Sequence, residues 1–151
     1  MAFFNSKLRY ALCAAMDLAM QPPNQACQSR EIAQRQQIPG PYLDQILAAL
    51  KGAGIVRSIR GAGGGYSLAR PAERIRVGDI VRALVRGDGL FAGRPVGPRP
   101  DATTTSVRWI VSEFESRIES LLTEQLDAVT LADLVRRKQD LDESLSIMPG
   151  I

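Results

Sequence analysis

Residues 57–66 read Arg57-Ser-Ile-Arg-Gly-Ala-Gly-Gly-Gly-Tyr66, with two arginines ahead of a run dominated by glycine. Glycine tolerates backbone conformations with positive φ and lets the chain approach another surface closely. Arginine presents forked donors that suit phosphates and guanine edges. Short apolar segments flank the run at residues 54–57 and 65–68. The pattern predicts a β-hairpin with a basic tip, the form of a wing that lies against DNA.

Three helices are predicted ahead of the hairpin, over residues 6–20, 30–36 and 41–53. In the third, Pro41 stands where a helix start tolerates proline, and Gly54 ends the helix. An apolar stripe at helical spacing faces inward on this third helix, formed by Leu43, Ile46, Leu47 and Leu50. The outward side of its first turns carries Pro41, Tyr42, Asp44 and Gln45. Helix, tight turn, helix and hairpin in this order predict a winged helix-turn-helix.

The charge distribution favours a polyanionic partner for the first half of the chain. Residues 1–70 hold eight basic and three acidic residues, a net charge of +5, whereas residues 71–151 carry a net charge of −2. A basic surface attracts nucleic acid, although mixed surface charge can also be merely solvated. No apolar run approaches the roughly 20 residues that span a bilayer, and the N-terminus lacks the order of a signal peptide. We therefore expect a cytoplasmic protein without a membrane partner.

The composition of the chain excludes most classes of enzyme. The 151-residue chain has no histidine and two cysteines, Cys13 and Cys27, so it lacks Ser-His-Asp and Cys-His catalysis and any Cys₂His₂ zinc site. The glycine run matches neither nucleotide motif, since it lacks the P-loop lysine and has Tyr66 where the last glycine of G-x-G-x-x-G belongs. A merely flexible hairpin remains the alternative to a DNA-contacting wing. We expect no enzyme, no metal and no cofactor.

The second half of the chain predicts a dimer. A short helix over 77–85 is followed by a Gly-, Pro- and Arg-rich loop over 86–103, then by a long helix over about 104–126 and a last short helix over 131–138. Steps of four and three residues along the long helix form a heptad seam: Val107, Val111, Phe114, Ile118 and Leu121. A two-fold partner helix would cover this seam; the alternative is packing within its own domain.

Several of these segments resemble the IscR/NsrR/CymR-type bacterial transcription regulators, often called the Rrf-two family. The resemblance rests on Ser6-Lys-Leu-Arg-Tyr-Ala, on Pro41-Tyr-Leu-Asp-Gln-Ile and above all on the hairpin motif, and it runs from Phe4 to about Asp142. It implies a dimeric winged-helix DNA binder. By that resemblance, four residues of the third helix would enter the major groove: Pro41, Tyr42, Asp44 and Gln45. Arg60 and Gly61 would enter the minor groove, and Lys7 and Arg57 would suit phosphates.

The chain departs from this family in its loop. Many members hold an iron–sulfur cluster through three cysteines there, but residues 87–103 contain none, and Ser106 stands where IscR-like relatives place a histidine. Because clusters are held chiefly by thiolates, we expect none bound in that manner. Of the two cysteines, Cys13 is expected to be buried and Cys27 more exposed, and a thiol redox switch at either remains open.

These observations predict a mainly helical protein with a small β-hairpin. Residues 1–85 would form the DNA-binding domain, 86–103 a sensor-type loop, and 104–151 the dimerisation helix with a C-terminal helix. The expected function is sequence-specific regulation of transcription, as a repressor, by a homodimer on double-stranded DNA with a pseudo-palindromic operator. The alternatives are a winged-helix protein-interaction module and a redox or metal sensor with unusual ligands. The sensed signal and any effector are not predicted.

Overall fold

The computed structural model describes residues 4–85 and 106–148, so the predicted loop over 86–103 lies outside the described residues. The described elements are α1 (Ser6–Ala19), α2 (Ser29–Gln36), α3 (Gly40–Gly52), β1 (Val56–Ile59), β2 (Gly65–Leu68), the short 3-10 helix η1 (Ala72–Arg74), α4 (Val77–Leu84), α5 (Ser106–Asp127) and α6 (Leu131–Ile147). The predicted order of three helices and a hairpin is confirmed, and with it the winged helix-turn-helix.

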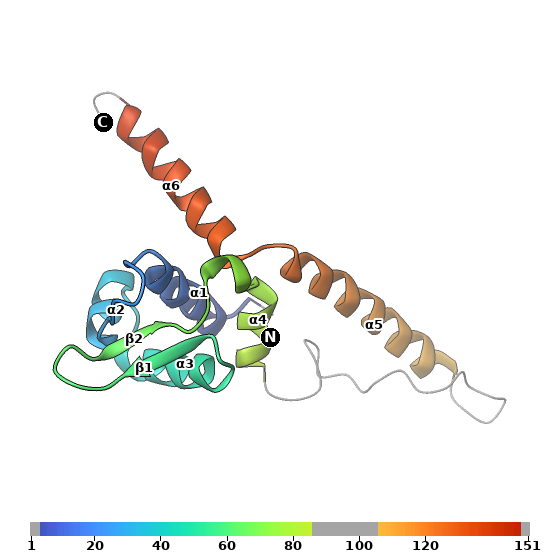
Figure 1. The fold of residues 1–151 in the computed structure, drawn as a ribbon. Helices are drawn as coiled ribbons and strands as arrows, with labels where there is room; N and C mark the ends of the chain where they lie inside the picture. Colours follow the sequence, from blue (N-terminus) through green and yellow to red (C-terminus); the bar gives the residue numbers. More distant parts are fainter. Residues whose placement is uncertain (1–3, 86–105, 149–151) are drawn as a thin grey trace.

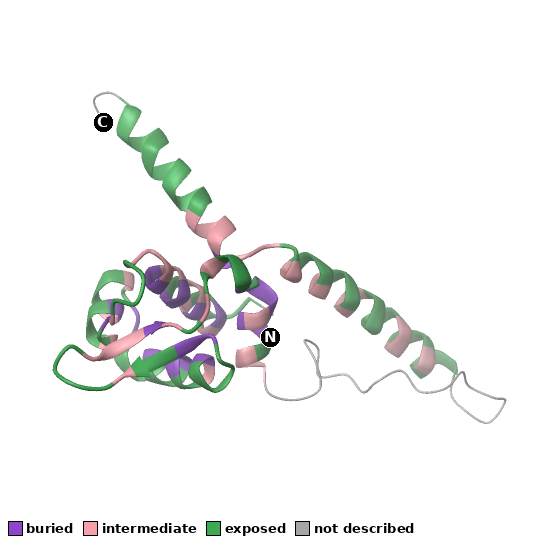
Figure 2. Ribbon diagram, viewed as in Figure 1, coloured by how far each residue is buried: buried purple, intermediate pink, exposed green. Residues whose placement is uncertain are grey.

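The elements divide into a compact body and two projecting helices. Helices α1 to α4 pack together with the hairpin, whereas α5 and α6 extend away from this body on different sides (Figure 1). Buried residues gather in the body, while α5 and most of α6 are exposed or half-buried (Figure 2). Helix α5 has no buried residue. No helix among the described residues is long and apolar enough to cross a bilayer.

The core forms because each helix of the body has one apolar face. Small residues on α1 let α2 and α3 pack closely against it, and the inward stripe predicted for α3 is fully buried. Removing each large aliphatic side chain from water stabilises the fold by about 1.5–3 kcal/mol. The main core consists of Ala11, Ala14, Ala15, Leu18, Cys27, Ile32, Ile38, Leu43, Ile46, Leu47, Leu50, Ile55, Val56, Ile75, Ile80 and Leu131.

A buried carboxylate joins α1 to α2. Asp17 is 1% exposed and accepts two hydrogen bonds from the Arg35 guanidinium, at 2.7 and 2.9 Å, and one from the Gln36 amide at 2.9 Å. Burial of an unpaired carboxylate would be costly, so these three donors are what make its position tolerable. The hydrogen bond to Asp17 raises the pKa of Arg35 above its ordinary value. This charged pair joins α2, the first helix of the helix-turn-helix, to α1.

The hairpin is a two-stranded antiparallel sheet in which Val56 pairs with Leu68 and Ile59 with Gly65. We call residues 56–68 the wing. Its second strand is also bridged to the segment before α2, because the backbone N–H groups of Cys27 and Tyr66 donate to each other's carbonyls at 2.8 and 2.7 Å. The wing is therefore anchored to the helix-turn-helix as well as to its own strands.

The side chain of Asn5 caps α1 by accepting from the Leu8 N–H at 3.0 Å. Two predicted helix bounds were wrong. Helix α2 begins at Ser29 itself, and Glu31 accepts from the backbone N–H of Gln28. Helix α6 continues to Ile147 instead of ending near residue 138. Thr130 caps α6, since its Oγ1 accepts from the Asp133 N–H at 3.1 Å.

Candidate nucleic-acid interface

The outer side of the first turns of α3 is open to solvent. All four predicted residues, Pro41, Tyr42, Asp44 and Gln45, are exposed, because the inward stripe occupies the opposite side of the same helix. Helix α3 follows α2 after a turn in which Gln37 adopts a left-handed conformation with φ of 53°. The structure thus brings the predicted residues together on one accessible helix face, the placement that a recognition helix needs.

An aromatic contact orients Tyr42 on this face. Its ring lies edge-on to that of Tyr10 from α1, with centroids 5.9 Å apart and an angle of 69° between the planes. Such T-shaped pairs are favourable, so the Tyr42 side chain is held although 46% of the residue is exposed. Tyr10 was not among the predicted site residues. Its contact joins two distant segments, which local periodicity does not reveal.

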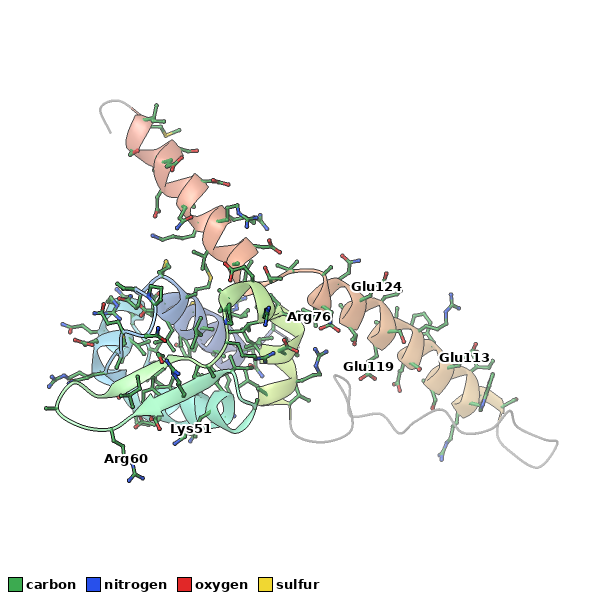
Figure 3. All side chains as sticks on the ribbon, in the orientation of Figure 1. Lys51, Arg60, Arg76, Glu113, Glu119 and Glu124 are labelled. Atoms are coloured by element: carbon green, nitrogen blue, oxygen red, sulfur yellow. The ribbon has the colours of Figure 1, made fainter. Side chains whose placement is uncertain are left out.

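The wing tip presents Arg60 to solvent. The exposed Arg60 side chain is directed away from the body of the domain (Figure 3). Next to it, Gly61 has φ of +109°, a conformation that residues with a side chain rarely adopt. The N–H of Gly64 donates to the Gly61 carbonyl at 2.9 Å and closes the turn. The tip is thus a tight turn with one projecting cation.

Glycine at position 65 allows the wing to dock. Gly65 has φ of +149°, and a Cβ atom there would collide with the backbone carbonyl of Cys27 and crowd the N–H of Gln28. The two bridge hydrogen bonds between Cys27 and Tyr66 require this close approach. Gly65 therefore has a structural role: it lets the wing pack against the segment that leads into α2.

Arg57 is engaged within the protein. Its Nε donates to Ser67 Oγ at 3.0 Å, and its Nη2 donates to Asn24 Oδ1 at 2.7 Å. Asn24 lies in the turn after α1 and has φ of 63°. Arg57 therefore ties that turn to the wing, and a phosphate would have to compete with these two acceptors. The predicted phosphate contact of Arg57 stays a prediction.

Two lysines complete the candidate interface. Lys7, half-buried in the first turn of α1, lines a small cavity with residues of α4. Lys51 stands in the last turn of α3 and is exposed; it points out from the body on the same side as Arg60 (Figure 3). Lys51 was not predicted to bind DNA. Its basic side chain in the last turn of α3 gave no clear signal in the sequence, because such residues also suit a helix C-terminus without any ligand.

The cysteines lie the opposite way round from the expectation. Cys13 is exposed on α1, whereas Cys27 is buried at 3% exposure. Cys27 is covered because the wing bridges its backbone, and its Sγ accepts a contact of 3.5 Å from Arg35. A soluble oxidant reaches Cys13 more readily than Cys27.

The available donors do not fit an iron–sulfur cluster held by three thiolates. The chain has two cysteines and no histidine, and one of those cysteines is enclosed in the core. Among residues 4–85 and 106–148, no three carboxylate or thiol side chains are grouped so that they could hold a metal ion. Clusters are held chiefly by Cys thiolates, with histidine as the main substitute, and neither set is available here.

The predicted seam on α5 is open to solvent. Val107, Val111, Phe114 and Leu121 are between 51% and 69% exposed, and Ile118 is half-buried. Ile110, which broadens the seam, is 55% exposed. An apolar stripe of this length on the outside of a helix marks an interaction surface. Among the described residues of one chain, α5 contacts the body chiefly through α4, and four of the five seam residues stay exposed.

Comparison with known proteins gives this architecture a family. The family model Rrf2, described as iron-dependent transcriptional regulator, matches residues 4–137. Protein rrf2 of Nitratidesulfovibrio vulgaris is 34% identical over 134 residues, covering 87% of this chain and 85% of that protein. The regulator IscR of Cronobacter sakazakii is 33% identical over 143 residues, covering 92% of this chain and 83% of its own length.

Solved structures agree with this result. T. potens IscR superposes with a TM-score of 0.69 at 31% identity, covering 97% of this chain and 92% of that one. CymR, described as the global cysteine regulator of B. subtilis, superposes with a TM-score of 0.67 at 31% identity, covering 91% and 98%. The relatives of this chain are transcription regulators and not enzymes. With its winged helix, exposed α3 face and basic wing tip, the chain belongs to the Rrf2 (Rrf-two) family of DNA-binding transcriptional regulators.

Proposed function

We propose that this protein is a homodimeric repressor that binds a pseudo-palindromic operator in the bacterial cytoplasm. Residues 1–85 read the DNA, and residues 104–151 join the two chains, with 86–103 as the sensor-type loop. Repression requires only that the bound dimer occupy a promoter. A reading domain and a dimerisation helix are sufficient for that.

The exposed face of α3 supports direct readout in the major groove. Gln45 offers the donor and acceptor that pair with the edge of adenine, and Tyr42 is held outward beside it by Tyr10. Pro41 and Asp44 border them on the same face. Arg60, with Gly61 beside it, suits a narrow minor groove, whose negative potential attracts arginine. The single observation that carries the proposal is that Tyr42, Gln45 and Arg60 are all exposed to solvent.

The positive charge of residues 1–70 supports the same orientation. Lys7 and Lys51 lie at the ends of α1 and α3 respectively, where contact with phosphates would position the recognition helix without reading sequence. Arg57 can contribute only by exchanging one of its internal acceptors. Each phosphate contact that forms adds to the salt dependence of binding.

The α5 seam supports the dimer. Five residues in heptad spacing face solvent or are only half-buried in one chain, and the same stripe on a second chain would cover them in a two-fold arrangement. Two reading domains then meet two half-sites about one helical turn apart, or a multiple of it. A pseudo-palindromic operator follows from that symmetry.

The proposal is tested by comparing Arg60→Ala with Lys7→Met in mobility-shift titrations at several salt concentrations. The operator is first obtained by in vitro selection with the wild-type protein. Arg60→Ala should weaken operator binding by about tenfold or more and relax preference at the minor-groove positions. Lys7→Met should weaken binding to all sequences and lower the salt slope by about one.

Two results would contradict the proposal. Unchanged operator affinity in Arg60→Ala would remove the wing from the interface. Wild-type protein that selects no sequence from the pool, and binds DNA without preference at any salt concentration, would favour a winged helix used for protein interaction instead.

A further inference from the structure

Helix α4 meets the end of α5 at a cluster of three charged residues. The Arg82 guanidinium donates to Asp127 at 2.8 and 3.3 Å and to Asp79 at 3.0 Å. Asp79 is on the same helix as Arg82, whereas Asp127 is the last residue of α5, 45 positions further along the chain. One arginine therefore bridges the DNA-reading body and the proposed dimerisation helix. We call Asp79, Arg82 and Asp127 the joint.

The backbone around the joint is held closely as well. A Cβ atom at Gly78 would collide with the Asp127 carboxylate, so this carboxylate occupies the space that a side chain at position 78 would fill. Beyond α5, the Val77 N–H donates to the Val129 carbonyl at 2.9 Å, and the Leu131 N–H donates to the Ile75 carbonyl at 2.7 Å. The direction in which α5 leaves the body is thus restrained by side chains and backbone together.

The joint also reaches the base of the wing. Arg70, two residues after β2, lies 3.9 Å from the second Asp79 oxygen, which accepts from the backbone N–H of Arg76 at 2.9 Å. Burial alone would raise the pKa of Asp79, but these donors and Arg82 hold it below its ordinary value. Asp79 is accordingly ionised at neutral pH. The ionic contacts run from the wing base through α4 to the end of α5.

We infer that Arg82 is a positioning residue for operator recognition: by fixing the direction of α5 relative to α4, it sets the spacing of half-sites that the dimer accepts. This inference rests on the proposed function, because it requires dimerisation through α5. One added base pair moves a half-site by about 3.4 Å and rotates it by about 35° around the duplex. A dimer with a rigid joint cannot follow that change, whereas a dimer with a loosened joint can.

The test uses the full-length protein and two variants that loosen the joint by different routes. Arg82→Met removes the bridging cation and keeps the apolar stem. Gly78→Ala keeps the Arg82 side chain but displaces the Asp127 carboxylate and crowds Arg82 Nη1. Because alanine favours helix more than glycine does, the variant is expected to stay folded. Arg136→Met is the matched control: Arg136 pairs with Asp133 three residues earlier on α6, a helix that carries none of the joint residues.

The readout is affinity for a series of duplexes in which selected half-sites are separated by the optimal spacer or by one base pair more or fewer. Wild type and Arg136→Met should lose about tenfold or more on either change of spacer. Arg82→Met and Gly78→Ala should lose about threefold or less, with unchanged affinity for an isolated half-site and unchanged dimer mass in sedimentation. A role in stability alone would lower every affinity together and leave the spacing profile unaltered.

The outcomes distinguish failure of the inference about Arg82 from failure of the proposed dimer. If both joint variants lose as much affinity as the wild type on a change of spacer, the role of Arg82 is overturned and the proposed dimeric repressor is unaffected. A wild-type protein that is monomeric, or that selects single half-sites, would overturn the proposed dimer and the inference with it. If Arg82→Met fails to fold, Gly78→Ala decides the result.

Discussion

Replacing Arg35 with methionine is expected to destabilise the protein more than any change of an exposed ion pair. Arg35 supplies two of the three hydrogen bonds that reach the Asp17 carboxylate. Methionine keeps much of the apolar length of arginine but removes the charge and the donors. The Asp17 carboxylate, 1% exposed, would retain only the Gln36 amide.

The magnitude follows from what is left behind. Breaking a buried pair by removing one partner costs about 3–5 kcal/mol, and the Arg35 side chain is 41% exposed, so entering water offsets part of the loss. We therefore expect about 3 kcal/mol, which for a chain of this size lowers the melting temperature by roughly 6–12 °C. Asp17→Asn removes the buried charge itself and should cost about 1–2 kcal/mol.

The double variant distinguishes this reasoning from a general loss of packing. With neither charge present, Asp17→Asn/Arg35→Met should be about 2 kcal/mol more stable than the sum of the two single losses. Urea denaturation followed by circular dichroism measures all three, at one protein concentration because the proposed dimerisation would shift the apparent stability. Arg136→Met, which breaks an exposed pair, should change stability by less than about 0.5 kcal/mol. Additive losses, or a loss below about 1 kcal/mol for Arg35→Met, would refute the explanation.

Two further predictions concern the seam and the wing. Phe114→Glu places a charge at a seam position that is 60% exposed in one chain and should convert the proposed dimer to monomer in analytical ultracentrifugation; a dimer that persists would contradict the proposed interface. Gly65→Ala should cost about 2 kcal/mol, because φ of +149° is strained for alanine. It should also weaken operator binding by shifting the wing. Gly63→Ala, where a Cβ meets nothing within 4 Å, serves as its control, and equal binding by both variants would show that wing docking does not matter.

The sequence by itself determined the elements and their faces. Helical spacing of apolar residues located the inward stripe of α3 and left Tyr42 and Gln45 outward, because burial of an amphipathic helix requires one apolar side. The arginine and glycine pattern predicted the wing, because glycine tolerates the positive φ of a tight turn and the arginines make that turn basic. Helix α6 was predicted too short. Its second half holds Leu141 and Leu145 at helical spacing, but both are exposed, and the helix is supported locally there by pairs such as Lys138 with Asp142.

Only the tertiary structure decided which distant residues meet. Asp17 and Arg35 are 18 positions apart, and Arg82 and Asp127 are 45 apart; nothing in local spacing pairs them. The burial of Cys27 has the same origin, since it depends on the wing returning to bridge that segment. Periodicity reports how one element divides between core and solvent, whereas these contacts depend on the relative placement of elements that the whole core sets. For this protein, the exposed faces of α3 and the wing could be predicted from the sequence, whereas the contacts that hold them in position could not.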